Sequence, residues 1–382
     1  MSTAVYLDYN ATTPVAGEVV ESMLPHLTHH FGNPSSSHFS GRTAAAAIDA
    51  ARASVANLLG AATGEIVFTG SATEADNLAL LGVARSLAGD KRHLVVSAVE
   101  HPAVIEPARH LQSEGWDLSV IPVDAHGRVD PTAVAAALRA DTALVSIMHA
   151  NNEVGTIQPV AQIAALTRAR GILLHTDAAQ SAGKIPLNVD ALGVDLLTLA
   201  GHKFYAPKGV GALYVRTGTP LKPILFGAGQ ECGLRPGTEN VAQIVGLGAA
   251  ARLARERLPA APQRLRTLRD ALHERLNAAV PGLQLNGHPT ERLPNTLHVS
   301  FPGIAGRELL SRVAGRVSAS VGSACHSESD SVSGVLAAMG CDTRRALGAV
   351  RFSVGWMTTP EEIAAAAAAL ADEAHALLAQ RH

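Results

Sequence analysis

Short runs of β-branched and aliphatic residues recur along this chain, and alanine-rich amphipathic stretches separate many of them. The candidate strands lie at residues 66–68, 93–97, 143–148, 172–176, 194–200 and 210–215. Strands that alternate with helices pair in parallel and are buried on both faces. The alternation therefore predicts an α/β fold with a mostly parallel sheet flanked by helices. With 47% hydrophobic residues, the chain has enough apolar side chains for such a core.

The pattern changes in the last third of the sequence. Long helices are predicted over 240–280, followed by a strand at 296–300, a helix near 307–313 and a strand around 349–354. A chain of 382 residues is too long for one small core and suits two packed domains. We expect a large domain over residues 15–255 and a smaller α+β domain formed by residues 1–14 and 256–382.

The final helix has a clear start signal. Thr359 is expected to be its N-cap, Pro360 occupies the first helical position, and Glu362 is placed to close a capping box.

Charge and cysteine content exclude several classes of protein. The formal net charge is −2 and there is no dense run of Lys and Arg, so no nucleic-acid or membrane-surface role is indicated. The three cysteines have neither the even count of a disulfide framework nor the spacing of a zinc site, and they favour a reducing, cytoplasmic setting. The N-terminus does not resemble a signal peptide, and no apolar run reaches the roughly 18 residues of a membrane span.

A lysine lies directly after one of the apolar strands. Lys203 follows the run at 194–200 and precedes a Pro- and Gly-rich turn in GHKFYAPKGVGALYV. Lysine is rarely buried unless its amine is used. An enzyme that depends on pyridoxal phosphate (PLP) uses such an amine, because it binds the cofactor aldehyde as a Schiff base. The position alone is more typical of a solvated lysine at a strand end.

An aspartate ends the preceding strand. Asp177, in LLHTDAAQ, comes 26 residues before Lys203 (203 − 177), with one predicted strand between them. PLP requires a carboxylate beside its pyridine nitrogen, which keeps that nitrogen protonated and makes the ring an electron sink. Ligands of open α/β sheets collect at the carboxyl ends of strands, so both residues are expected to face one crevice. Asp177 alone would also fit a helix N-cap.

A third segment suits an anion. TGSATEADN, at 69–77, follows a strand and opens a helix, and its small and hydroxyl residues leave backbone N–H groups available to an anion such as a cofactor phosphate. The same residues also fit an ordinary capping box from Ser71 to Glu74.

Together these segments resemble the cysteine desulfurases, in the aminotransferase class-V branch of the fold type I PLP enzymes. The resemblance covers nearly the whole chain, and its blocks occur in the family's order. They are YLDYNATTP at 6–14, FGNPSSSH at 31–38, TGSATEADN at 69–77, EHPAV at 100–104, NNEVGTIQP at 151–159, HTDAAQ at 175–180, GHKFYAPKGVGALYV at 201–215, GQECGLRPGTEN at 229–240, GSAC at 322–325 and VRFSVG at 350–355.

The resemblance implies a cofactor site built from many parts of the chain. Lys203 would bind the cofactor covalently, and Asp177 would pair with the pyridine nitrogen. The other implied cofactor contacts are Asn152 and Gln180 beside the ring and its phenolic oxygen, His101 stacked on the ring and able to move protons, Ala72, Thr73 and His202 at the phosphate, and Thr238 from the second subunit of a homodimer.

The resemblance also implies how L-cysteine is bound and cleaved. Arg351 would hold the substrate carboxylate through a two-pronged contact, supported by Asn33 and Asn152. Cys325 would attack the substrate sulfur as a thiolate, keep it as a persulfide, and release L-alanine. The polar segment 320–334 around Cys325 is expected to be a mobile surface loop that passes sulfur to an acceptor protein. No metal site is expected.

Three other functions compete with this prediction. A selenocysteine lyase shares the scaffold and resembles the stretch ASVGSACHSESD as well. A non-catalytic PLP scaffold would not need every catalytic position filled, and an ordinary aminotransferase has no use for GSAC on a loop.

Some positions are expected to be bystanders, and others depart from the family pattern. Cys232 and Cys341 are expected to play no catalytic part. Ala200, Ser71 and Trp356 stand where many members have serine, glycine and arginine, respectively.

Overall fold

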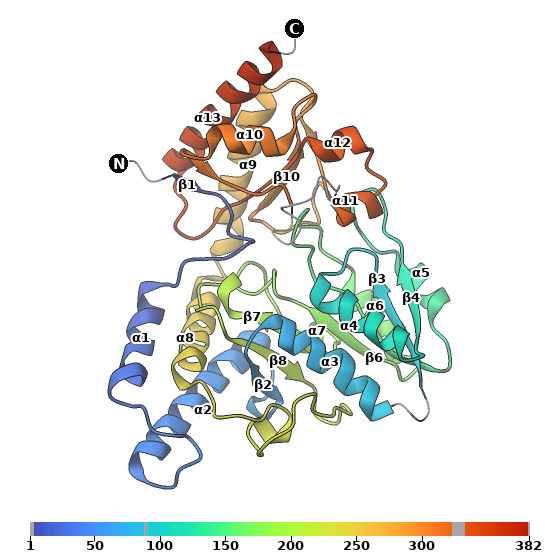
Figure 1. The fold of residues 1–382 in the computed structure, drawn as a ribbon, viewed down its shortest axis with the longest axis vertical. Coiled ribbons are helices and arrows are strands. Elements are labelled where there is room, and N and C mark those ends of the chain that lie inside the picture. Colours follow the sequence, from blue (N-terminus) through green and yellow to red (C-terminus); the bar gives the residue numbers. More distant parts are fainter. Residues whose placement is uncertain (1–3, 88, 90, 323–332, 381–382) are drawn as a thin grey trace.

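The computed structural model describes residues 4–87, 89, 91–322 and 333–380. Its centre is a seven-stranded sheet in the order β2-β8-β7-β6-β5-β3-β4 (Figure 1). The strands are β2 Ile66–Thr69, β3 His93–Ser97, β4 Asp117–Ile121, β5 Thr142–Ser146, β6 Leu173–Asp177, β7 Leu196–Ala200 and β8 Gly211–Val215. Strands β7, β6, β5, β3 and β4 run parallel, whereas β8 is antiparallel to both β7 and β2. The predicted α/β class, with a mostly parallel sheet, is confirmed.

The edge strand β4 is absent from the sequence prediction. Its residues DLSVI lie at the border of the sheet, where most of their side chains are exposed or half-buried. An edge strand needs no continuous apolar run, because one side of its ladder faces solvent. The apolar pattern that marked the buried strands is therefore missing here.

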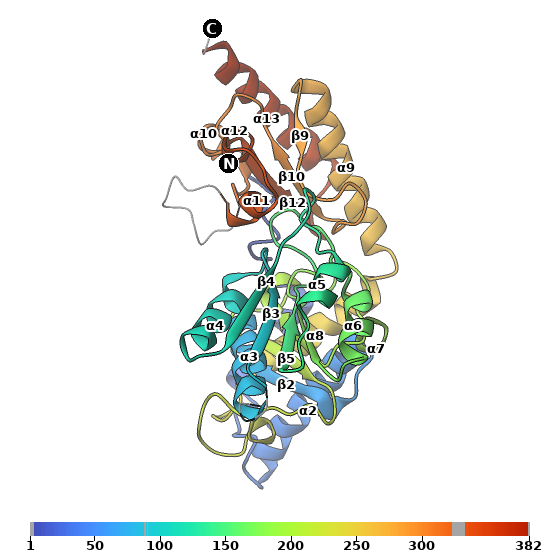
Figure 2. The same ribbon diagram turned by 90° about the vertical axis from the view of Figure 1, so that its right-hand side faces the viewer.

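Helices cover both faces of the large sheet, as predicted. Figure 2 shows α3 (Ala72–Leu87) and α4 (Pro102–Ser113) on one side, and α6 (Val160–Arg168), α7 (Val189–Leu192) and α8 (Val241–Arg257) on the other. Neighbouring residues of β3 point to opposite sides: Leu94 and Val96 join the core under α3 and α4, whereas Val95 joins the core under α6 and α8. The remaining helices of this part are α1 (Gly17–Thr28) and α2 (Phe39–Leu59), which pack on α8, and α5 (Pro131–Ala137).

The last third of the chain builds a second, smaller layer with its own hydrophobic core (Figure 1). Its antiparallel sheet has the order β12-β10-β9, with bounds Ala349–Ser353, Thr296–Ser300 and Gln284–Leu285. The helices of this part are α9 (Ala261–Ala279), α10 (Gly306–Val313), α11 (Gly334–Ala338), α12 (Thr343–Leu347) and α13 (Pro360–Ala379). The domain boundary near residue 255 stays a prediction.

The predicted start of α13 is confirmed. The Thr359 hydroxyl accepts a hydrogen bond from the Glu362 N–H at 3.2 Å, and the Glu362 carboxylate accepts one from the Thr359 N–H at 2.9 Å. Among the described residues, no helix is both long and apolar enough to cross a membrane.

The N-terminal segment joins the two parts. Strand β1 (Val5–Tyr6) pairs with β11 (Val317–Ser318), and Asp8 forms a bridge with Ser353 at the end of β12. The chain then passes between the two sheets, where the Asn10 amide contacts Asn295 and Thr296 at the start of β10 and Asn152 after β5. This crossing places Asn10 where β12 approaches the carboxyl ends of the parallel strands.

Candidate active site

A cavity of about 280 Å³ lies where these parts meet. Its walls come from the start of α3, the start of α4, the segments after β5, β6 and β7, the N-terminal crossing and β12. The lining residues are Asn10, Ala11, Ser71, Ala72, Thr73, Asp76, His101, Ala103, Met148, Ala150, Asn152, Asp177, Ala179, Gln180, Ala200, His202, Lys203 and Arg351. Most of the residues that the sequence assigned to a cofactor and its substrate therefore share one cavity.

Lys203 is held on the wall of this cavity by the N-terminal segment. It ends a single 3₁₀ turn, Gly201–Lys203, directly after β7. Its Nζ donates hydrogen bonds to the carbonyl oxygens of Asn10 at 2.7 Å and Ala11 at 2.8 Å. The amine is thus fixed by backbone atoms at the carboxyl end of the sheet.

Asp177 is the last residue of β6 and is almost fully buried. One of its oxygens accepts a hydrogen bond from the Ala179 N–H at 2.9 Å. Burial raises the pKa of the Asp177 carboxyl, while the backbone hydrogen bond and the nearby His101 and Lys203 act in the opposite direction. A cationic N–H beside this carboxylate would oppose the effect of burial on its pKa. A protonated pyridine nitrogen is such a group.

Two more acids lie buried near Asp177. Burial and the neighbouring Asp177 raise the pKa of Asp76 well above its ordinary value, and burial raises that of Glu100 to about 8. Asp76 also lies 3.5 Å from the His175 ring, whose pKa burial lowers to about 3. Both partners of this contact therefore favour their neutral forms, although the distance alone would suggest an ion pair.

The start of α3 forms one wall of the cavity. The Ser71 hydroxyl accepts a hydrogen bond from the Glu74 N–H at 3.1 Å, and the Glu74 carboxylate accepts one from the Gly70 N–H at 2.8 Å. These side chains order the turn, and Ala72 and Thr73 line the cavity at the first turn of a sixteen-residue helix. Strand β8 packs tightly behind it, since a Cβ on Gly211 would lie 2.9 Å from the Ala72 nitrogen. The capping interaction and an anion site are therefore compatible here.

Two histidines, His202 and His101, also line the cavity. The His202 Nδ1 lies 3.1 Å from the Thr12 hydroxyl, and burial together with Lys203, Lys208 and Lys184 lowers its pKa to about 4. The His101 Nδ1 accepts a hydrogen bond from the Ala103 N–H at 3.1 Å, which caps α4 and leaves Nε2 as the protonated nitrogen of the neutral ring. Burial lowers the pKa of His101 as well, although Asp177 opposes this.

Arg351 enters from β12, and its side chain is only 2% exposed. Its Nη2 donates to the Asp8 carboxylate at 2.8 Å, and its Nη1 donates to the Asn152 carbonyl at 3.0 Å. Its buried Nε has no hydrogen-bond partner in the part of the chain that the structure describes. The guanidinium therefore retains an unused donor beside the cavity.

These groups fit PLP. An anion site at α3, a carboxylate at β6 and a lysine amine after β7 correspond to the phosphate, the pyridine nitrogen and the aldehyde of that cofactor.

The structure does not bring every predicted residue to the cavity. Asn33 and Thr238 are exposed and are absent from its lining, and the Asn33 side chain instead accepts a hydrogen bond from the Ser35 N–H. Cys325 lies outside the described residues. The roles of these three residues stay predictions, as do those of the assigned residues that line the cavity.

Four residues in or beside the site received no role from the sequence. Asp8 and Asn10 lie in the YLDYNATTP block. Two polar side chains in an extended segment were the feature of the sequence that could have indicated a role for them. Asp76 lies four residues after Ala72, about one turn further along α3, so helical spacing could have placed it on the same face. Lys184 lies in the segment after β6 and showed no signal beyond its charge.

The departures from the family pattern have defined surroundings. Ala200 lines the cavity, and Ser71 caps α3. The Trp356 ring stacks on Tyr205, with ring centroids 3.7 Å apart, and the Arg257 guanidinium lies 4.3 Å from the centroid of the Trp356 ring.

The two described cysteines lie away from the cavity. Cys232 is exposed with a left-handed φ of 56°, and Cys341 is half-buried. Neither thiol belongs to the cavity lining, and the expectation that both are bystanders stays a prediction.

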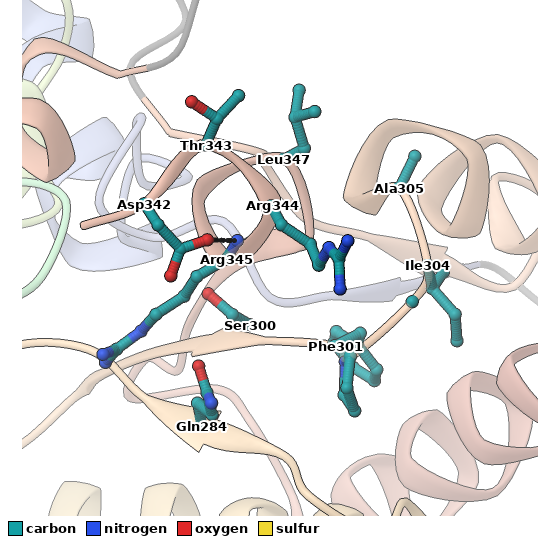
Figure 3. A pocket seen from close by; sticks show the side chains of 12 residues that line it. Gln284, Ser300, Phe301, Ile304, Ala305, Asp342, Thr343, Arg344, Arg345 and Leu347 are labelled. Atoms are coloured by element: carbon teal, nitrogen blue, oxygen red, sulfur yellow. Dashed lines mark hydrogen bonds between the residues drawn. The ribbon is translucent and has the colours of Figure 1, made fainter.

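A larger cavity of about 860 Å³ lies in the smaller part of the chain, between the end of β10 and α12 (Figure 3). Its lining includes Phe301 and Ile304. Arg345 lines it as well, but the Arg345 guanidinium donates to the Asn286 side chain and the Leu285 carbonyl. This cavity lacks the combination of lysine, histidine and buried carboxylate groups found in the smaller one, so size alone does not identify the active site.

The fold and cavity define an α/β enzyme with a lysine and an aspartate at the carboxyl ends of neighbouring parallel strands. Residues 5–365 match the aminotransferase class-V family, and the chain belongs to that family. Membership implies the use of PLP.

Named relatives agree with this assignment. A cysteine desulfurase IscS from Dictyoglomus turgidum is 46% identical over 364 residues, covering 95% of this chain and 92% of that protein. A solved NifS-like protein superposes with a TM-score of 0.91 at 39% identity, covering 97% of this chain and 99% of that one. A structure described as SspA in complex with cysteine gives a TM-score of 0.82 at 38% identity, covering 92% of this chain and 99% of that one.

Proposed function

We propose that this chain is a PLP-dependent cysteine desulfurase that converts L-cysteine to L-alanine and transfers the sulfur to Cys325. The observation that carries the proposal is the single cavity that holds Lys203, Asp177 and Arg351, in a chain 46% identical to a cysteine desulfurase. The alternative of a selenocysteine lyase is not favoured, because the named relatives are cysteine desulfurases.

The residues that would bind the cofactor are those brought together around the cavity. Ala72, Thr73 and His202 would hold the phosphate, Asp177 would hold the pyridine nitrogen, and Gln180, Asn152 and His101 would lie beside the ring. When bound through Lys203, PLP supplies an electron sink that acidifies the Cα–H bond of an amino acid.

The chain's own groups then position the substrate and move its protons. The guanidinium of Arg351 holds the substrate carboxylate, and Asn152 and Asn33 support it. The Lys203 amine would act as the base that removes the Cα proton, and His101 would carry a proton at Nε2.

The sulfur transfer balances without an added oxidant. The thiolate of Cys325 attacks the substrate sulfur, an S–S bond forms, and the Cβ–S bond breaks. The electrons of that bond stay with the carbon skeleton, which gains a proton and leaves as L-alanine. The sulfur remains on Cys325 as a persulfide, from which an acceptor protein takes it.

A homodimer completes the site in this proposal. Helix α1 exposes the apolar side chains of Val20, Leu24 and Leu27, which are 50%, 56% and 64% accessible and share one helical face. Phe226 is 85% exposed in the segment that leads to Thr238. Apolar surface of this extent suits contact with a second copy, through which Thr238 would reach the partner's phosphate. Equilibrium sedimentation tests this directly, and a monomer at micromolar concentration would contradict it. We place the enzyme in the cytoplasm.

The desulfurase proposal is tested by product analysis. The purified holoenzyme is incubated with L-cysteine and a thiol reductant, and alanine and sulfide are measured. Equal amounts of both are expected. Parallel reactions with L-selenocysteine compare kcat/KM for the two substrates. Absence of alanine from cysteine, with rapid alanine release from selenocysteine, would overturn the assignment in favour of the lyase.

A further inference from the structure

A second lysine lies buried beside the active site. Lys184 is 5% exposed, and it follows the end of β6 by seven residues (184 − 177). Lysine is almost never buried without partners. Its Nζ donates to the Gln180 Oε1 at 2.9 Å and to the Asn10 Oδ1 at 3.3 Å.

Gln180 and Asn10 connect this lysine to Lys203. The Gln180 Nε2 donates to the carbonyl oxygen of Asn10 at 3.0 Å, and that same oxygen accepts the hydrogen bond from the Lys203 Nζ at 2.7 Å. The carbonyl thus uses its two acceptor positions for the two side chains. Lys184 and Lys203 are joined through one glutamine amide and one backbone carbonyl.

The direction of the Gln180 amide depends on Lys184. Because a charged Lys184 can only donate, the amide end that faces it must be the oxygen. The nitrogen then faces the Asn10 carbonyl. A reversed amide would place its oxygen against that carbonyl oxygen, so the hydrogen bond to Asn10 would be lost in either protonation state of Lys184. With a charged Lys184, the hydrogen bond between the two side chains would be lost as well.

Lys184 itself does not reach the cavity. Gln180, Asn10 and Lys203 line the cavity, whereas Lys184 does not. Burial, together with Lys203 and Arg351, lowers the pKa of Lys184 well below its ordinary value, but its amine can donate to Gln180 in either protonation state.

We propose that Lys184 is a positioning residue, which fixes the Gln180 amide and thereby the carbonyl group on which the Lys203 amine rests. The proposal rests on the proposed function of the site and adds a residue that does not touch substrate or cofactor.

A double-mutant cycle tests the proposal. It comprises Lys184→Met, which removes the donor while keeping an unbranched side chain of similar length, Gln180→Ala, and the double variant. Each protein is measured as the cofactor-loaded enzyme. The readouts are kcat and KM for cysteine, and the visible circular dichroism of the bound cofactor without substrate, which reports its orientation.

We expect Lys184→Met to lower kcat at least about tenfold, to leave KM within about threefold, and to reduce the visible signal by roughly half or more. The double variant is expected to match Gln180→Ala alone, because coupled residues are not additive. Lys222→Met, at an exposed lysine, controls for the loss of a positive charge.

Two results would overturn the proposal. One is a folded Lys184→Met enzyme with wild-type kcat and visible signal, and the other is a double variant whose loss equals the product of the two single losses. If the methionine variant does not fold, the same cycle is run with Lys184→Gln, and additive losses in that cycle would overturn the proposal as well. A wild-type enzyme that binds no PLP or forms no alanine would instead reject the proposed function.

Discussion

The Arg351 guanidinium is paired with the Asp8 carboxylate at 2.8 Å, across the join between β12 and the N-terminal segment. Asp8 is on a segment that the small sheet holds through Ser353, and Arg351 comes from that sheet. The arginine expected to bind the substrate carboxylate is therefore already oriented by a protein carboxylate. Its position does not depend on substrate.

Arg351→Lys should raise KM for cysteine by at least about tenfold, which corresponds to ~1.4 kcal/mol of lost binding. Lysine keeps the charge but cannot contact Asp8, the Asn152 carbonyl and a substrate carboxylate with one planar group. The visible absorbance of bound PLP should not change. Steady-state kinetics and an absorbance spectrum check both parts. Arg344→Lys, at the other cavity, is the matched control, and an unchanged KM in Arg351→Lys would remove the assigned role.

Lys203→Ala should abolish the visible absorbance of lysine-linked PLP and all formation of alanine. No other described lysine lines the cavity, so nothing replaces the amine that binds the aldehyde. The spectrum of the purified protein and the alanine assay provide the measurement. Lys208→Ala, at an exposed position five residues later, should keep both properties. A variant at position 203 with a wild-type spectrum and turnover would refute the cofactor assignment.

Much of the fold was predictable because buried parallel strands carry their own signal. The strand at Thr296–Ser300 matches its prediction at both ends, and β3 does so as well. In β3, the continuous apolar run at 94–96 is bounded by polar residues on both sides, which leaves little choice. β4 was missed because an edge strand lacks that run. Local patterns also predicted the capping box at Thr359, which depends on neighbours in sequence alone.

The site was predictable only where motifs lie at strand ends or helix starts. Lys203 and Asp177 follow from such positions, and the resemblance supplied the others. Asp8 contacts Arg351 and Asn10 contacts Lys203 across long stretches of chain, and no local pattern encodes such contacts. The same applies to the second buried lysine, because its burial depends on how separate segments pack.

Glu100 should make stability depend on pH in the direction opposite to that of an ordinary surface carboxylate. Burial raises its pKa in the folded protein from 4.5 to about 8. The folded state therefore holds this proton more tightly than the unfolded state. The stability that protonated Glu100 contributes to the folded state is fully present below about pH 4.5. It is lost as pH rises toward 8, by up to ~1.4 kcal/mol per pH unit.

Glu100→Gln should remove this dependence, because the amide stays neutral. Its free energy of unfolding relative to wild type should rise between about pH 5 and pH 8, as measured by denaturant titration of the holoenzymes. Glu106→Gln, at an exposed position on α4, is the control. A constant difference across this range would show that Glu100 is ionised in the folded protein.

Cys325→Ser should separate sulfur transfer from the earlier steps. A serine hydroxyl is far too weakly acidic to replace a thiolate, so no persulfide can form. Arg351, Lys203 and Asp177 are unchanged in this variant. The enzyme should still bind cysteine, with a change in the absorbance of the cofactor, but it should release no alanine.

Mass spectrometry of the wild type after brief exposure to cysteine should find one additional sulfur on the peptide that contains Cys325. Cys232→Ser and Cys341→Ser are matched controls, since one thiol is exposed and the other half-buried, and neither lines the cavity. Both should retain alanine formation. Alanine release from cysteine at the wild-type rate by Cys325→Ser would rule out Cys325 as the nucleophile. Loss of turnover with cysteine but not with selenocysteine would instead favour the lyase, because selenium leaves carbon more readily than sulfur and its departure would then need no attacking thiolate.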